Sequence, residues 1–176
     1  MVGSLVMQLL RNRQIKQIIT VDTLPLRCQF SQQLGADEVI NASEIDPVEV
    51  IKQLTNGRGV DLVIDCVGGY AGIKSFEQTQ DMVADKGTIQ LIALYQQQSL
   101  PLYSEKIMQK RLVAGILTEE PPMKTTLRAM ESIEKGIIQA GKMITHQFPY
   151  AEAKEAFDFL WYTPESGLGV LLDWEL

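Results

Sequence analysis

Short apolar segments alternate with segments of helical periodicity along the chain, and this alternation constrains the fold more than any other feature. The expected strands are 15–21, 39–40, 61–67, 88–94, 112–117, 143–148 and 168–174. The expected helices are 2–10, 25–34, 46–56, 71–83, 123–140 and 151–162. Such an order favours parallel strands, because each helix carries the chain back across the sheet. The sequence therefore predicts an α/β fold with a doubly wound, mostly parallel sheet.

Turn and capping residues mark the ends of two helices. Pro25 suits the first turn of a helix, and Gly35 stands where a left-handed residue ends one. Asp46 precedes Pro47 and is followed by Glu49 at the spacing of a capping box. These residues predict helix starts near 25 and 46.

The charge of the chain argues against nucleic acid as a partner. The formal net charge is −6, and no run of Lys or Arg suggests an anionic membrane surface. No apolar stretch is long enough to cross a bilayer, and no cleavage signal follows the apolar N-terminus. Cys28 and Cys66 stand far apart, so no disulfide framework or thiolate metal site is indicated. We expect a cytoplasmic protein that binds neither nucleic acid nor membrane.

Asp22 is the first candidate site residue, because it closes an apolar strand. A carboxylate in that position of a dinucleotide-binding fold accepts hydrogen bonds from the hydroxyl groups of the adenosine ribose. It also repels a 2′-phosphate, which favours NAD over NADP. The alternative is a solvated polar residue at a strand end, and Asp22 alone does not decide between the two.

Other candidates lie at a helix start and at two strand ends. Gly3 precedes Asp22 by the span expected between the phosphate loop and the acidic residue of a dinucleotide fold. Residues 66–69 and 92–94 follow predicted parallel strands, where ligands bind in open α/β sheets. Each is also compatible with ordinary turn and core residues. The expected convergence of three strand ends on one crevice favours function.

No pattern indicates a catalytic residue or a metal ligand in this chain. His146 is the one histidine and lies in an apolar segment far from both cysteines in sequence, which favours a structural role. The nucleophile elbow Gly-x-Ser-x-Gly and the full phosphate-loop motif Gly-x-x-x-x-Gly-Lys-Ser/Thr are missing.

Four stretches together resemble the medium-chain dehydrogenase/reductase family. They are ITVDTLPLR (Ile19–Arg27), LGADEVI (Leu34–Ile40), GVDLVIDCVGG (Gly59–Gly69) and THQFPYAEAKEAF (Thr145–Phe157). They occur in the family's order over nearly the whole chain. The resemblance is to the zinc-type polyol and threonine dehydrogenase branch, and it implies a Rossmann-type domain that binds NAD.

The resemblance also implies a set of cofactor-binding residues. They are Gly3, Asp22, Arg27, Val67, Gly68, Ile92, Ala93, Leu94 and Ile116. Asp22 would bind the adenosine ribose with Arg27 on the adenine side, and residues 67–68 would flank the adenine or ribose. Residues 92–94 and Ile116 would approach the nicotinamide. Strand 112–117 resembles the edge strand through which such subunits form homodimers.

The chain departs from the family pattern at its beginning. The family's catalytic domain with its zinc ligands, the first strand of the cofactor domain and two glycines of the phosphate loop have no counterpart. We therefore expect a fragment, a sequence with a mis-called gene start or the product of a remnant gene, and in each case a sheet that lacks its first strand. Residues 1–142 would form the NAD-binding domain, and 143–176 would be the segment that packs on the catalytic domain in the family.

Three functions remain open at this point. The first is the cofactor-binding portion of an NAD-dependent zinc-type alcohol or polyol dehydrogenase, inactive alone, whose intact relatives transfer a hydride between an alcohol and nicotinamide. The second is a non-catalytic, self-associating domain with weak or no nucleotide binding. The third is a zinc-free, NADPH-using quinone reductase, against which Asp22 argues because its carboxylate would meet a 2′-phosphate.

Overall fold

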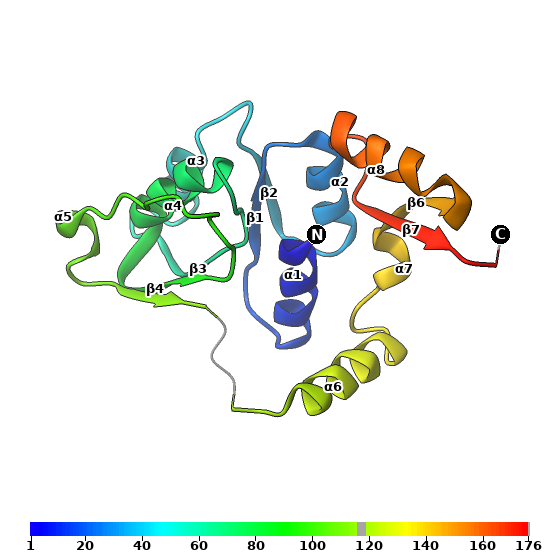
Figure 1. The fold of residues 1–176 in the computed structure, drawn as a ribbon. Helices are drawn as coiled ribbons and strands as arrows, with labels where there is room; N and C mark the ends of the chain where they lie inside the picture. The colour runs from blue at the N-terminus through cyan, green and yellow to red at the C-terminus, as the bar shows by residue number, and fades with distance from the viewer. Residues whose placement is uncertain (116–118, 176) are drawn as a thin grey trace. The chain divides into compact units, whose positions relative to one another are not determined.

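The computed structural model describes residues 1–115 and 119–175, and their contacts divide the chain into two compact units. One unit combines Met1–Ser43 with Glu120–Leu176, and the other is the continuous segment Glu44–Glu119. The strands are β1 (Ile19–Asp22), β2 (Glu38–Asn41), β3 (Val60–Asp65), β4 (Val83–Leu91), β5 (Arg111–Ala114), β6 (Ile144–Pro149) and β7 (Gly169–Asp173) (Figure 1). The helices are α1 (Val2–Asn12), α2 (Pro25–Gln33), α3 (Pro47–Leu54), α4 (Ala71–Met82), α5 (Ser104–Ile107), α6 (Pro122–Glu134), α7 (Ala140–Met143) and α8 (Ala153–Tyr162), with a 3-10 turn η1 at Tyr150–Glu152.

Every strand pair is parallel, which confirms the predicted α/β class with helices flanking parallel strands. Among the described residues the strands form three sheets rather than one. The sheets are β1–β2, β3–β4–β5 and β6–β7. The separation follows the hydrogen bonding, since no ladder joins β2 to β3 or β5 to β6 within the described ranges.

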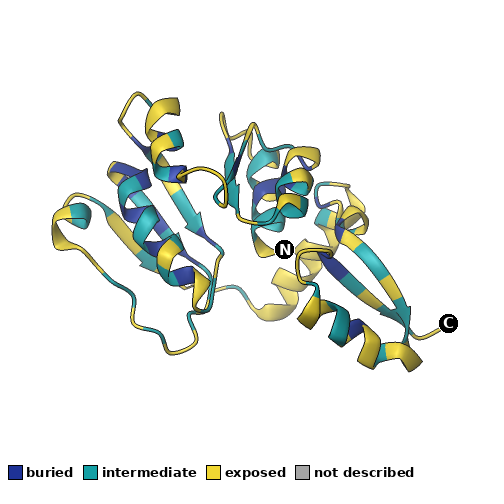
Figure 2. Ribbon diagram, turned by 90° about the horizontal axis from the view of Figure 1, so that it is seen from above, coloured by how far each residue is buried: buried dark blue, intermediate teal, exposed yellow. Residues whose placement is uncertain are grey.

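The segment Glu44–Glu119 has its own apolar core. Phe76 on α4 and Ile89 on β4 are 1% and 0% exposed, and Val83 and Leu91 complete the cluster. Figure 2 shows buried positions, in dark blue, on helices and strands of the chain. Helix α4 contacts both β3 and β4 and packs beside α3. Burying side chains of this size is the main favourable contribution to the stability of such a unit.

The other unit is held together by residues from both ends of the chain. Met7 from α1, Ile18 and Leu34 share one buried cluster with Met143 and Leu168. The segment after residue 142 is therefore packed on the first forty residues here. The domain boundary expected at residue 142 stays a prediction.

Helix ends follow the local sequence signals where those signals are strong. Gly35 has φ +101°, the left-handed conformation expected after α2. The Asp46 carboxylate accepts a hydrogen bond of 2.9 Å from the Val48 amide and caps α3.

Four expected elements differ from the observed ones by more than two residues at one end. The strand expected at 15–21 is β1, which begins only at Ile19. The helix expected at 123–140 is present as α6, but its expected end was wrong, because α6 ends at Glu134 and Gly136 turns the chain with φ +69°. The strand expected at 88–94 begins earlier, at Val83, and ends at Leu91. The strand expected at 112–117 is β5, which spans Arg111–Ala114, while residues 116–118 lie outside the described ranges.

No helix in the described ranges is both long and apolar enough to span a membrane.

Candidate functional site

Asp22 is the last residue of β1, as the sequence predicted. It is half-buried, and its Oδ1 atom accepts hydrogen bonds from the main-chain amides of Thr23 and Leu24 at 2.8 and 3.1 Å. These bonds orient the carboxylate at the turn from β1 into α2. Its Oδ2 atom accepts no hydrogen bond from the residues that the structure describes, so it remains available to hydroxyl groups of a ligand.

Arg27 lies in the first turn of α2, close in sequence to Asp22. Its Nε atom is buried and has no hydrogen-bond partner among the described residues. An unpaired buried donor is costly, because it has lost its water without gaining an acceptor. Arg27 is therefore suited to a ligand that supplies an acceptor at this position.

Gly3 lies in the first turn of α1 and is half-buried. The amides of Ser4 and Leu5 donate to the Met1 carbonyl, so the main chain is already helical at this point. Gly3, Asp22 and Arg27 all belong to the unit that contains both ends of the chain.

The other predicted residues lie in the unit Glu44–Glu119, in the loops that follow β3 and β4. Val67 and Gly68 follow β3, and residues 92–94 follow β4, so both groups occupy carboxyl ends of paired parallel strands. The two loops are in contact, because the Gly69 amide donates to the Leu94 carbonyl at 2.9 Å. A Cβ atom added at Gly68 would lie 2.5 Å from that same oxygen, so this approach requires a glycine.

The side chains near these loops differ in exposure. Val67 is 40% exposed and Leu94 is 84% exposed, while Ile92 and Ala93 are half-buried. An apolar side chain as exposed as that of Leu94 is available for contact with a ligand. Ile116, the remaining predicted residue, lies outside the described ranges.

Asp65 was not predicted, although it is the most buried acidic side chain near the candidate site. It ends β3, is 3% exposed and accepts three hydrogen bonds from the Val67 amide (2.9 Å), the Ser75 hydroxyl (3.2 Å) and the Tyr95 hydroxyl (3.0 Å). The sequence signal for it was weak, because Asp65 lies inside the strand expected at 61–67, and only the structure ends that strand, β3, at Asp65.

Burial changes the pKa values of Asp65 and of its neighbours Cys66 and Tyr95. It raises the pKa of Asp65, while the three hydrogen bonds to the carboxylate act in the opposite direction. Burial, with the charge of Asp65 beside it, raises the pKa of the Cys66 thiol to about 11. The same two causes raise the pKa of Tyr95, which therefore stays a hydrogen-bond donor at neutral pH. A thiol with such a pKa is a poor nucleophile, which argues against covalent chemistry at Cys66.

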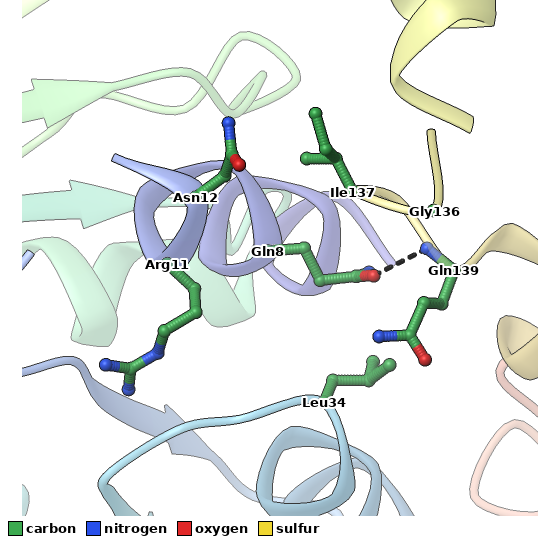
Figure 3. A pocket seen from close by; sticks show the side chains of 7 residues that line it. All are labelled: Gln8, Arg11, Asn12, Leu34, Gly136, Ile137 and Gln139. Carbon is green, nitrogen blue, oxygen red and sulfur yellow. Dashed lines mark hydrogen bonds between the residues drawn. The ribbon is translucent and has the colours of Figure 1, made fainter. Parts of the chain in front are cut away.

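Two pockets of the described structure contain none of the predicted residues. One, of about 230 Å³, lies between α1 and residues 136–139. Figure 3 shows that the Gln8 side chain points across it, where its Oε1 accepts a 2.7 Å hydrogen bond from the Gln139 amide. Arg11, also at its rim, donates to the Gly35 carbonyl and to Asp37. Gln8 and Arg11 thus already make hydrogen bonds to other parts of the same unit, which favours a structural role for both side chains. The second, of about 460 Å³, lies between α2 and β2.

Within the described ranges, no group of three or more His, Cys, Asp and Glu side chains could hold a metal ion.

Curated relatives of the chain are dehydrogenases. It is 28% identical to L-threonine 3-dehydrogenase of Bacillus licheniformis over 144 residues, which are 82% of this chain and 41% of that protein. It is 27% identical to sorbitol dehydrogenase of Halalkalibacterium halodurans over 158 residues, which are 89% of this chain and 45% of that one. The chain thus spans less than half the length of these relatives.

Solved structures show the same fold. The alcohol dehydrogenase TADH from Thermus sp. ATN1 superposes with a TM-score of 0.81 at 23% identity, covering 97% of this chain and 48% of that one. An alcohol dehydrogenase zinc-binding domain protein from Burkholderia ambifaria gives 0.81 at 21%, covering 97% and 45%. At these identities the likeness concerns the fold alone.

The family model for zinc-binding dehydrogenases matches residues 2–133, which is most of the chain. Its match covers β1 with Asp22 and the loops after β3 and β4. The chain belongs to the zinc-binding dehydrogenase family.

Proposed function

We propose that this chain binds NAD and serves as the cofactor-binding portion of an NAD-dependent zinc-type alcohol or polyol dehydrogenase. The observation that supports this most directly is Asp22. Its carboxylate stands at the carboxyl end of a parallel strand with Oδ1 held by two amides and Oδ2 available. Two vicinal ribose hydroxyls would donate to such a carboxylate.

The unpaired Nε of Arg27 fits the same ligand. The adenosine half of a dinucleotide carries several acceptors, among them the ring nitrogens of adenine, and one of them would satisfy this buried donor. We assign Asp22 and Arg27 to the adenosine half of the cofactor. Gly3, in the first turn of α1, would be the third glycine of the phosphate loop, which allows close packing of the helix.

The loops after β3 and β4 supply the remaining assignments. Val67 and Gly68 would flank the adenosine, and Ile92, Ala93 and Leu94 would contact the nicotinamide through apolar surface. When bound, NAD supplies the acceptor for a hydride. The residues of this chain bind and orient it.

Oxidation of an alcohol would also need a group that polarises the alcohol oxygen, and zinc performs this in the family that the chain resembles. Because the chain spans less than half of its relatives, the activity of the whole protein is part of the proposal. We expect no turnover from this chain alone. Turnover of a polyol with NAD and added zinc would contradict that expectation.

Calorimetric titration with NAD tests the proposal. We expect micromolar binding that Asp22→Ala abolishes, while Asp158→Ala, which removes a half-buried carboxylate paired with Lys154 on α8 in the same unit, leaves it unchanged. Asp22→Asn preserves an oxygen acceptor for the two amides and removes the charge. It should weaken NADH binding and narrow the preference for NADH over NADPH, because the repulsion of the 2′-phosphate is gone.

Each contrary result points to a different function. If the parent chain gives no heat with NADH or NADPH, the non-catalytic, self-associating module replaces the proposal. If NADPH binds more tightly than NADH, the quinone reductase branch replaces it.

We further propose a homodimer formed through strand 112–117. In support, β5 stands last in the order β3–β4–β5, so one of its edges has no strand partner among the described residues. In sedimentation equilibrium, the weight-average molar mass should rise with concentration from that of a monomer toward that of a dimer. A cytoplasmic location is also proposed, because Cys28 and Cys66 stand too far apart in the sequence to suggest a disulfide framework.

A further inference from the structure

We propose that Asp65 is a positioning residue of the dinucleotide site, which acts through Tyr95 to hold the loop after β4 in the conformation that receives the nicotinamide. This inference rests on the proposed NAD binding. It assigns Asp65 no contact with the cofactor.

The first part of the evidence is that one carboxylate reaches both loops. Its Oδ1 atom accepts from the Val67 amide in the loop after β3, and its Oδ2 atom accepts from the Tyr95 hydroxyl in the loop after β4. The Asp65 carbonyl also accepts from the Ile92 amide at 3.2 Å. Asp65 thus binds Ile92, the first predicted nicotinamide contact, through its main chain, and Tyr95, three residues further along the same loop, through its side chain.

Tyr95 is packed so that its hydroxyl reaches Asp65. Its ring meets Phe76 edge-on with centroids 6.5 Å apart. A Cβ atom at Gly72 would lie 2.9 Å from the Tyr95 ring and 2.8 Å from the Val67 carbonyl, so the absence of a side chain there allows the ring to lie against α4. Ser75 on α4 donates to Asp65 Oδ1 and connects the same carboxylate to the helix.

Burying the Asp65 carboxylate has an unfavourable desolvation free energy, which a purely structural contact would not require. A 3% exposed carboxylate has lost most of its hydration, and burial disfavours its charged form, as the raised pKa of Asp65 shows. An apolar side chain would fill the same position at a lower desolvation cost. Directional bonds to two separate loops are what the carboxylate provides and an apolar residue does not.

The test compares two conservative variants in the unit Glu44–Glu119. Tyr95→Phe removes only the hydroxyl that donates to Asp65. Tyr103→Phe is the matched control, because its hydroxyl donates to the Glu77 carboxylate at 2.8 Å on the surface and makes no hydrogen bond to residues 66–69 or 92–95. Binding of NADH and of ADP-ribose, which lacks the nicotinamide, is measured for both variants by calorimetry.

We expect Tyr95→Phe to weaken NADH binding by about threefold to tenfold, the effect of losing one hydrogen bond to a charged group when part of its energy orders the loop. ADP-ribose binding should be unchanged, and Tyr103→Phe should affect neither ligand. Hydrogen exchange of the free protein should be faster at the Ile92 and Gly69 amides in Tyr95→Phe alone. Ser75→Ala removes the bond to α4 and serves as a second variant, with a smaller effect in the same direction.

Three results would overturn the inference. If Tyr95→Phe binds NADH as tightly as Tyr103→Phe does, positioning fails while NAD binding stands. If Tyr95→Phe weakens NADH and ADP-ribose equally, the residue stabilises the unit as a whole and has no specific role toward the nicotinamide. If the parent chain binds neither ligand, the proposed function fails and this inference fails with it.

Discussion

Replacing Gly68 with alanine should separate the two loops of the candidate site, and the size of the effect follows from one distance. The added Cβ would lie 2.5 Å from the Leu94 carbonyl oxygen, whereas ordinary van der Waals contact begins at 3.4 Å. The loops must therefore move apart by about 0.9 Å, the difference between the two values. Overpacking of this kind costs about 1–3 kcal/mol. The Gly69–Leu94 hydrogen bond of 2.9 Å is lost as well, which adds about 1 kcal/mol.

The expected loss of stability is therefore about 2–4 kcal/mol for the unit Glu44–Glu119. Both tryptophans, Trp161 and Trp174, lie in the other unit, so their fluorescence does not follow this change. Hydrogen exchange read by mass spectrometry on peptides from 44–119 does. In a melting experiment the shift is on the order of 10 °C for a domain of this size class.

Gly141→Ala is the matched control, because nothing lies within 4 Å of the added Cβ and the residue is in helix α7. We expect it to be neutral or slightly stabilising, by up to ~1 kcal/mol, since alanine is the better helix former. If Gly68→Ala exchanges its amides as slowly as Gly141→Ala, the close approach of the loops is refuted.

Three further predictions concern stability. Asp37→Asn should destabilise the protein at neutral pH and make its stability less dependent on pH in the acid range. The hydrogen bond from the Ile18 amide, followed by that from Arg11, lowers the pKa of Asp37, so its carboxylate stabilises the fold above the ordinary value of 3.8, and this contribution is lost as the pH falls through the folded-state pKa. Denaturant unfolding at several pH values measures the difference. Phe76→Ala should cost about 3–5 kcal/mol in urea unfolding, since its side chain is 1% exposed, and a cost below ~1 kcal/mol would contradict the described core. Asp46→Ala should cost about 1 kcal/mol by loss of the cap on α3, and Asp46→Asn should restore most of it in the same assay.

The fold was predictable where local chemistry and tertiary packing agree. Pro25 and Gly35 mark the two ends of α2, and both lie where the sequence placed them. Asp22 is the last residue of β1 as expected, because a charged residue that follows a run of β-branched residues is favoured at the end of a strand. The parallel pairing follows from the alternation itself.

The remaining details depend on contacts that the linear pattern does not contain. Apolar residues continue at helical spacing beyond Glu134, but Gly136 takes a left-handed conformation and ends the helix. Strand β4 begins at Val83 and pairs with β3 through an irregular register, with Lys86 at φ +63° between its two parts. A non-glycine residue in that conformation is uncommon, so the sequence alone does not predict that a strand continues through Lys86.

The candidate site shows the same limit. Asp22 was found because a carboxylate at a strand end has a known use in nucleotide binding. Asp65 stands at an equivalent position, but its role depends on Tyr95 and Ser75, whose approach to it is set by the packing of α4 and the loop after β4. Spacing in the sequence does not reveal that approach.

The two-unit arrangement has a consequence for synthesis on the ribosome. The segment Glu44–Glu119 is continuous, so it can collapse around Phe76 as soon as it has left the exit tunnel. The first 43 residues share their core with Met143 and Leu168, which are made much later. Until those residues are made, the apolar side chains of Met7 and Ile18 lack part of their final contacts. We therefore expect a chaperone to bind the first 43 residues of the nascent chain.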